Sequence, residues 1–300
     1  MNEDIKITAC IICKNEEACI ETMLKSIQWV DEICILDTGS TDKTIEIAKK
    51  YTEMVYQDKR FYNEETKTFD FWWARNKAKE YASNQYIISL DCDEELITEW
   101  WIGKMKEMIR NNPEADAIWI KLWGWWNSYT TTPRLFRKEL DWYWNIHETV
   151  CPKNRVNSDI VIKYWTSPTH IEDPYLDMRI LEQEHIKEPT NTRIMYYLWR
   201  EYFYHHKWEE AKKIFEKYIT IWIFFEEVTD AMWLLANCYR YDWLWNGEKS
   251  REYLMKVILR NVNFKVAYKM LSEQMIDQKK KETWLKFAEI ATNEGMLFIH

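Results

Sequence analysis

The feature that most constrains the fold is an alternation of short apolar runs with longer amphipathic stretches in the first part of the chain. Each apolar run has the length of a buried strand, and each amphipathic stretch has the length of a surface helix. The runs cover residues 5–12, 33–37, 86–90 and 117–122, and the amphipathic stretches cover 16–28, 42–51, 71–82 and 98–111. Strands that alternate with helices in this way predict an α/β domain with a largely parallel sheet.

Beyond residue 190 the strand pattern fades and a helical pattern repeats. Three helix–turn–helix segments cover residues 196–219, 232–258 and 267–291. In the first, Trp208, Ala211 and Phe215 have the spacing and the aromatic–small–aromatic character of a tetratricopeptide unit. The sequence therefore predicts two domains, residues 1–188 and 189–300, the second an all-α stack of tetratricopeptide-like helices. Such a stack provides either a groove for an acceptor or partner, or a cap that stabilises the first domain.

Charge and hydrophobicity limit the class of protein. The net charge of −8 argues against nucleic-acid binding, which needs a basic face. No run approaches the roughly 18 apolar residues of a membrane helix, and the acidic N-terminus lacks the pattern of a signal peptide. A cytoplasmic protein is therefore expected. The seven scattered cysteines fit that compartment, and Cys10 and Cys13 lie within an apolar run, where buried thiols are expected rather than metal ligands.

Glycine is unusually rare and tryptophan unusually abundant, with 5 and 19 residues respectively. Their sum is close to the usual total for the two residues together. One hypothesis is that some of the tryptophans are glycines in the source organism, through a codon that is translated differently there. The alternative is an aromatic-rich protein whose tryptophans pack the core or stack on sugar.

Polar clusters follow the predicted strands. Lys14 and Glu16 follow the first, Asp37 ends the second, and Asp91 and Asp93 follow the run at 86–90. In open α/β sheets, functional groups gather beyond the carboxyl ends of the strands. Carboxylates alone would repel a phosphate, so a diphosphate substrate at this edge would need Mg²⁺ or Mn²⁺ between them. The alternative is that the acids cap the helix that follows.

Six segments in the same order resemble the inverting family 2 glycosyltransferases of the GT-A fold. The helices that follow resemble the branch with bacterial peptide S-glycosyltransferases of the sublancin type. The segments are "ITACIICKNEEACIETMLKSIQWVDEICILDTGSTDKTIEIAKKY", "FDFWWARNKAKEYA", "YIISLDCDEEL", "TPRLFRKE", "NIHETV" and "PTHIEDPY". The resemblance implies a metal-dependent enzyme that moves a sugar from a UDP-sugar to an acceptor.

The resemblance also implies roles for particular residues. Glu16 and Asp37 would hold the nucleoside, with Asp37 at the uracil, and Arg75 and Asn76 would lie near the uracil and diphosphate. Asp91 would sit by the ribose. Lys14 and Arg134 complete the expected donor-binding set. In the DXD motif Asp91-Cys92-Asp93, Asp93 would be the main metal ligand, with Asp91 and His170 as further ligands.

Glu148 falls where the family places its catalytic base, and His147 is a second catalytic candidate. Glu148 has a simpler alternative, an ion pair with Arg134 or Arg137, and His147 could be a buried structural histidine. Trp144 stands where related sequences usually have glycine, and Trp73 and Trp199 occupy positions where small residues are expected. Whether the active form carries glycine there is left open.

Two function classes remain. The first is an inverting transferase that acts on a peptide or protein, or, as the runner-up, on lipopolysaccharide or another cell-surface glycan. The second is a lapsed transferase domain that serves as a scaffold, with the helices recognising a partner. The sequence leaves open which sugar is carried, which acceptor atom is used and whether the protein forms a homodimer.

Overall fold

The computed structural model describes residues 4–124, 129–168, 173–221, 225–241 and 247–292. The chain divides into two compact units, Met1–Leu176 and Asp177–His300. This division lies twelve residues before the predicted boundary at 188, because helix α6 (Leu176–Lys187) belongs with the helical unit. A hydrogen bond from the Tyr202 hydroxyl to Glu182 ties α6 to the next helix (3.0 Å).

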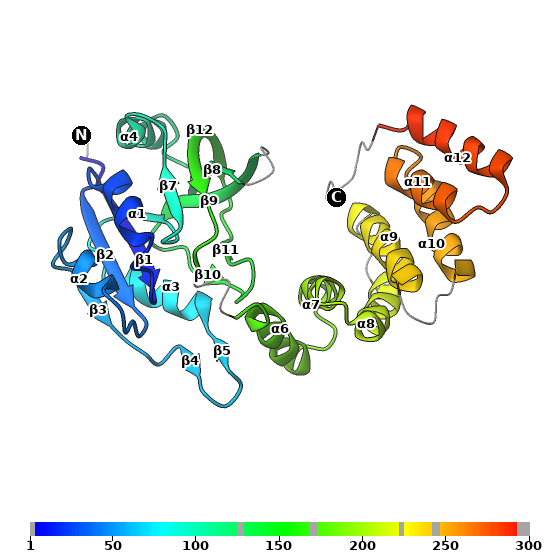
Figure 1. Ribbon diagram of the computed structural model, residues 1–300. Coiled ribbons are helices and arrows are strands. Elements are labelled where there is room, and N and C mark those ends of the chain that lie inside the picture. Colours follow the sequence, from blue (N-terminus) through cyan, green and yellow to red (C-terminus); the bar gives the residue numbers. More distant parts are fainter. Residues whose placement is uncertain (1–3, 125–128, 169–172, 222–224, 242–246, 293–300) are drawn as a thin grey trace. The chain divides into compact units, whose positions relative to one another are not determined.

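The first unit (Figure 1) is built on a sheet whose strands pair in the order β3-β2-β1-β6-β9-β8-β12-β7. Its strands are β1 (Ile7–Cys13), β2 (Glu32–Asp37), β3 (Val55–Gln57), β6 (Tyr86–Ser89), β7 (Glu94–Leu96), β8 (Ala117–Trp123), β9 (Tyr129–Arg137) and β12 (Arg155–Tyr164). Two small hairpins accompany the sheet, β4 (Tyr62–Asn63) with β5 (Thr68–Phe69), and β10 (Trp142–Tyr143) with β11 (Thr149–Val150).

Helices cover both faces of this sheet. On one face, α1 (Ile20–Ile27), α2 (Thr44–Ala48) and α4 (Trp101–Asn111) contribute to an apolar core with the alternate β1 residues Ile7, Ala9 and Ile11. On the other face, α3 (Phe71–Glu80) packs on Leu36 and on the β4–β5 hairpin. A strand buried on both faces is mostly apolar, which explains the composition of β1. Its buried Thr8 donates its hydroxyl proton to Glu32 (2.7 Å).

The four predicted strands and four predicted helices of this unit all form, but the sheet is mixed rather than largely parallel. The pairs of β1 with β2 and β6 are parallel, whereas β9 lies antiparallel between β6 and β8. The run 129–137 contains Pro133, which lacks a ladder donor, and the register shifts beside it. A proline within a run argues against a central strand, so the sequence did not predict β9.

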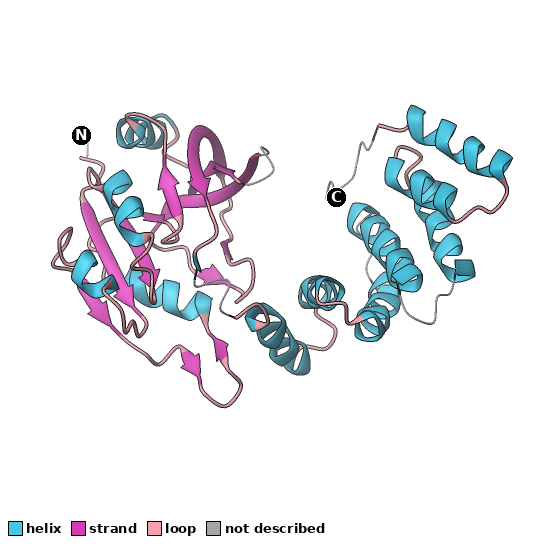
Figure 2. Ribbon diagram, in the orientation of Figure 1, coloured by secondary structure: helices cyan, strands magenta, loops and turns pink. Residues whose placement is uncertain are grey.

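The predicted all-α second part of the chain is confirmed, and its described residues form helices joined by loops (Figure 2). The helices after α6 are α7 (Thr192–Tyr204), α8 (Trp208–Ile221), α9 (Phe225–Tyr241), α10 (Gly247–Arg260), α11 (Lys265–Glu273) and α12 (Gln278–Ile290). Each contacts the next along the chain. Their shared core includes Trp199, Ala211 and Phe215, with Trp208 partly buried against it. The tetratricopeptide assignment itself stays a prediction.

Two further expectations can be compared with the structure. Cys10 and Cys13 are buried thiols of β1, as predicted. Across the helices that the structure describes, none combines the length and the apolar character that a bilayer span requires.

Candidate functional site

The predicted polar clusters meet at one edge of the sheet. Because β1, β2 and β6 run parallel, their carboxyl ends place Lys14, Asp37 and Asp91 at the same edge. The loops after β1 and β2 are joined by hydrogen bonds from Asn15 N–H to the Ser40 hydroxyl (2.8 Å) and from Glu16 N–H to the Thr44 hydroxyl (2.7 Å). The first two clusters therefore form one connected loop structure.

Asp37 ends β2 with its carboxylate buried. Its oxygens accept hydrogen bonds from the backbone N–H groups of Gly39 (3.2 Å) and Ser40 (3.1 Å), and from the Gln57 amide (3.4 Å). The residue is fully inaccessible to solvent. In this conformation Asp37 stabilises the turn that follows β2, and contact with a uracil would require that turn to open.

Asp91 lies between two arginines. Arg75 of α3 donates to Asp91 Oδ1 (2.7 Å), and Arg134 of β9 donates to Asp91 Oδ2 (3.0 Å). Burial alone would raise the pKa of Asp91, but the two guanidinium groups hold that pKa well below its usual range. Asp91 is therefore ionised, and both of its oxygens already have partners.

Glu94 completes the same cluster from the start of β7. Its carboxylate accepts from the Arg134 guanidinium and from the Asp91 N–H (2.9 Å). Burial raises the pKa of Glu94 to about 7, against the opposing effect of Arg134. Asp91 and Glu94 of "DCDEEL" are thus kept together by arginines from distant parts of the chain, where the sequence had suggested a metal ion. Asp91 and Asp93 precede β7, and Glu94 and Glu95 are its first two residues, so the acids lie at a strand rather than in the first turn of a helix.

Glu148 joins this cluster through Arg75. The Arg75 Nε donates to Glu148 Oε1 (3.2 Å), and the guanidinium lies over the Trp142 ring at 5.1 Å. Glu148 stands just before β11, in the loop of the β10–β11 hairpin. Glu148 forms its ion pair with Arg75, whereas the simpler alternative expected Arg134 or Arg137. We call Arg75, Arg134, Asp91, Glu94 and Glu148 the arginine–carboxylate cluster.

His147 differs from the expectation of a buried structural histidine. Its side chain is exposed, and its backbone has a φ of 53°, in the left-handed region. A catalytic role for His147 stays a prediction.

Asp93 and Glu16 are connected through Ser167. The Ser167 N–H donates to Asp93 Oδ2 (3.1 Å), and its hydroxyl donates to Glu16 Oε2 (2.7 Å). Asp93 is only 2% exposed. Ser167 therefore links the first and third polar clusters through side chains that are far apart in the sequence.

The residues present suit a metal ion shared with a substrate. In the part of the chain that the structure describes, no group of three or more His, Cys, Asp or Glu side chains is arranged to hold a metal. His170 lies outside the described residues. Mg²⁺ and Mn²⁺ commonly take one or two carboxylates and complete their coordination with phosphate oxygens and water. Asp93 is the carboxylate at this edge that would hold such an ion, which would supply positive charge beside a diphosphate.

Two predicted donor-binding residues contact residues outside the arginine–carboxylate cluster. The Asn76 side-chain amide donates a hydrogen bond to the Trp142 carbonyl (3.0 Å) and accepts one from the Trp142 N–H (2.9 Å). Asn76 therefore anchors the β10–β11 hairpin to α3. Lys14 is exposed, and its ammonium group lies 4.7 Å from the centre of the Tyr62 ring.

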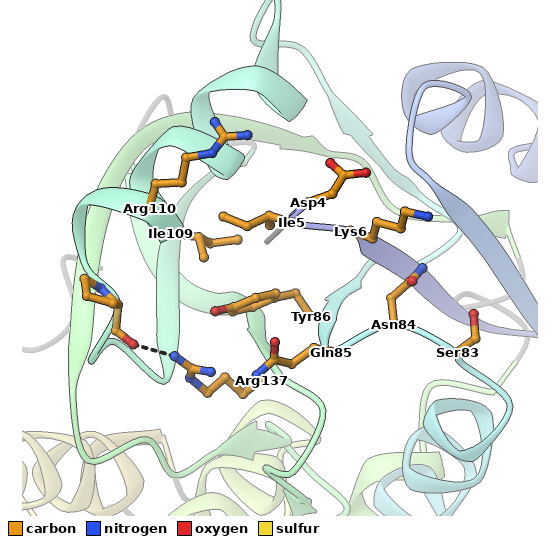
Figure 3. A pocket seen from close by; sticks show the side chains of 11 residues that line it. Asp4, Ile5, Lys6, Ser83, Asn84, Gln85, Tyr86, Ile109, Arg110 and Arg137 are labelled. Carbon is orange, nitrogen blue, oxygen red and sulfur yellow. Dashed lines mark hydrogen bonds between the residues drawn. The ribbon is translucent and has the colours of Figure 1, made fainter. Parts of the chain in front are cut away.

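A cavity of about 660 Å³ opens at the opposite edge of the sheet, where β1 and β6 begin (Figure 3). Its lining includes Asp4, Lys6, Asn84, Tyr86, Arg110 and Arg137. None of the predicted site residues within the described ranges lines it. This cavity is therefore separate from the site at the carboxyl edge.

Sequence reasoning missed two residues of the site. Glu94 was visible within the acidic run, but nothing marked it as the partner of Arg134. Ser167 precedes "PTHIEDPY" and carries no signal of its own, because a serine before a proline is common in loops.

The comparisons with known proteins point to the same family as the sequence motifs. The model of the family "Glycosyl transferase family 2" matches residues 8–165. A TPR repeat-containing protein of Synechococcus elongatus is 32% identical over 141 residues, covering 45% of this chain and 32% of that protein. The SPbeta prophage-derived glycosyltransferase SunS of Bacillus subtilis is 36% identical over 89 residues, covering 29% of this chain and 20% of SunS. The chain thus spans less than a third of the length of these relatives.

Among solved structures, S. aureus TarS 1-349 in complex with UDP-GlcNAc gives a TM-score of 0.47 at 13% identity. The likeness covers 98% of this chain and 93% of that one.

Proposed function

Because this chain belongs to glycosyl transferase family 2 and its first unit has the GT-A fold, we propose that it transfers a sugar from a UDP-sugar to a peptide or protein, with inversion. The proposal assigns the donor to the loops at the carboxyl edge of β1, β2 and β6. It assigns the acceptor's reacting atom to the side of Glu148.

The observation that carries the proposal is the double contact of Arg75. One guanidinium joins Asp91, in the DXD motif, to Glu148, the candidate base, at 2.7 and 3.2 Å. The two carboxylates come from segments far apart in the chain, and an arginine that is 8% exposed holds them in a fixed relation. A base that acts on an acceptor beside a bound donor requires this kind of proximity.

The chemistry follows from these positions. Glu148 would take the proton of the acceptor as that group attacks the anomeric carbon from the side opposite the diphosphate. The bond from that carbon to the diphosphate oxygen breaks, and UDP leaves. Arg75 and Trp142 would orient Glu148, the first by a hydrogen bond and the second by stacking on the guanidinium. Asp93 would hold Mg²⁺ or Mn²⁺, which stabilises the charge on the departing diphosphate.

The acceptor assignment rests on two features. The motifs resemble the peptide S-glycosyltransferase branch, and the second unit is a series of helix pairs whose consecutive members pack together. Helical repeats of this kind often present an extended surface to a peptide or protein. Lipopolysaccharide or another cell-surface glycan is the alternative acceptor within the same chemistry.

A specific observation favours a second candidate, a scaffold without catalysis. Asp37 is fully buried, Asp93 is 2% exposed, and both oxygens of Asp91 are already paired with arginines. A domain that no longer binds a UDP-sugar would tolerate a site whose carboxylates are buried or already paired.

The test uses the full chain with Mn²⁺ and a panel of UDP-sugars. The proposal expects slow release of UDP without acceptor, and Asp93→Ala should reduce the rate by about 100-fold or more. Asp93→Asn provides a second variant if the alanine variant does not fold. Asp159→Ala, which removes an exposed acid on β12, is the control and should keep the rate. Titration calorimetry that detects no UDP binding to the unaltered chain would favour the scaffold.

A further inference from the structure

Two tryptophans have a backbone conformation that large side chains rarely adopt. Trp144 has a φ of 63° and Trp100 a φ of 57°, both in the left-handed region. Residues with a β-carbon meet a steric penalty there, and glycine does not. Asparagine tolerates the region better than other side chains, whereas a bulky residue is an outlier.

At Trp100 no gain from the indole explains the conformation. This residue precedes α4 and is 84% exposed. The next residue, Trp101, contrasts with it, since its indole is buried and donates to the carbonyl of Ser26 (3.0 Å). Position 100 is also outside the arginine–carboxylate cluster, so strain that serves catalysis is no explanation there.

Trp144 opens the loop that carries Glu148. It directly follows β10, and the pairs Trp142↔Val150 and Tyr143↔Thr149 close the hairpin around residues 144–148. A left-handed residue at the start of such a loop reverses the chain direction. The loop has a second left-handed residue at His147 (φ 53°), directly before Glu148, so the backbone at 144 and at 147 together sets how the loop presents Glu148 to Arg75.

We infer that positions 100 and 144 are built for glycine, and that residue 144 is a positioning residue that acts on the reaction through Glu148. The second part rests on the proposed function. The scarcity of glycine, 5 residues against 19 tryptophans, agrees with the first part. Trp73 and Trp199 differ from these two, because they lie within α3 and α7 and their backbone does not require glycine.

The stability test separates backbone conformation from side-chain bulk. The full chain is made with Gly, Asn and Ala at position 144 and with Gly and Ser at position 100, and the melting temperature is followed by circular dichroism. All of these changes remove the indole, but alanine and serine keep the penalty of the left-handed region. We expect Trp144→Gly and Trp144→Asn to melt about 2–5 °C above Trp144→Ala. Position 100 is the N-cap of α4, where glycine and asparagine are favoured over alanine in any case, so the comparison there is Trp100→Gly against Trp100→Ser. Serine caps a helix at least as well as glycine but keeps the left-handed penalty, so Trp100→Gly should melt above Trp100→Ser. Trp101→Gly, the neighbouring control, should lose about 6–20 °C.

The kinetic test addresses the positioning role. If release of UDP is measured as in the proposed function, Trp144→Gly should raise kcat over Trp144→Ala by up to about 30-fold and leave KM for the UDP-sugar unchanged. The gain should disappear when Glu148→Gln is also present.

The outcomes are distinguishable. Equal melting temperatures for the Gly, Asn and Ala variants at 144, or for the Gly and Ser variants at 100, would overturn the glycine requirement at that position. A kinetic gain that persists with Glu148→Gln, or that appears in KM, would overturn the positioning role. If no variant releases UDP, the proposed function and the positioning role fail, while the melting temperatures still decide the glycine requirement. Mass spectrometry of the protein from its source organism, showing tryptophan at 100 and 144, would contradict the codon hypothesis.

Discussion

Replacing Arg75 with methionine removes the cation that joins Asp91 to Glu148. Methionine keeps much of the length and apolar bulk of the side chain, so the change acts mainly on charge and hydrogen bonding. We expect Arg75→Met to lower the stability of the first unit and to weaken UDP binding, because the loop that carries Asp91 and the hairpin that carries Glu148 lose their common partner.

The magnitude follows from the contacts. With an effective dielectric constant of about 20, ion pairs at 2.7 and 3.2 Å each give an attraction of roughly 5–6 kcal/mol. Desolvation offsets most of this, and removing one partner of a buried pair costs about 3–5 kcal/mol. Asp91 keeps Arg134 and has a side chain that is 31% exposed. The loss should therefore lie near 3 kcal/mol, or about 6–12 °C in Tm for a unit of this size.

The assay is thermal unfolding of the full chain by circular dichroism, together with calorimetry of UDP binding in the presence of Mn²⁺. Lys79→Met is the matched control, since Lys79 lies one turn further along α3, its side chain is equally buried, and it pairs with Asp141 instead. That variant should lose stability but bind UDP normally. A Tm for Arg75→Met within about 2 °C of the unaltered chain would refute the reasoning, as would equal loss of UDP binding in both variants.

Two further predictions concern the helical unit. The Asp230 carboxylate is fully buried without a hydrogen-bond partner among the described residues, and burial raises its pKa to about 7 although Arg200 opposes this. Because the folded state favours the protonated carboxyl, its contribution to stability is fully present below the unfolded pKa of about 3.9 and is lost as the pH rises through 7. Urea unfolding at pH 5–8 should therefore show falling stability with a slope that Asp230→Asn reduces, while Glu201, whose pKa burial also raises to about 7, keeps part of the slope. An unchanged slope in the Asp230→Asn variant would contradict this. Trp199 is fully buried, with its ring centre 3.7 Å from that of Phe215. Trp199→Ala should therefore lower the free energy of unfolding by about 3–5 kcal/mol in the same urea measurement. A more stable variant would show that this site also prefers a smaller residue.

Local patterns were sufficient to predict the elements and their order. The apolar runs of β1, β2, β6 and β8, the helices between them and the change to helices in the second unit depend on neighbouring residues, so the sequence shows them directly. The sequence also predicted that Asp37 and Asp91 lie at one edge of the sheet, because the carboxyl ends of parallel strands lie at the same edge. The strand β9 was not predicted, because Pro133 and the irregular register beside it obscure the pattern.

The pairing of charges was decided by the tertiary structure. Arg75 meets Glu148 across 73 residues and Arg134 meets Glu94 across 40, and both contacts depend on the position of β9 beside β6 and of the β10–β11 hairpin against α3. Electrostatic pairing depends on distance and burial, which residue type and spacing do not specify for segments so far apart. For the same reason the sequence could show that Trp144 stands in an unusual place, but only the backbone conformation shows that the place suits glycine.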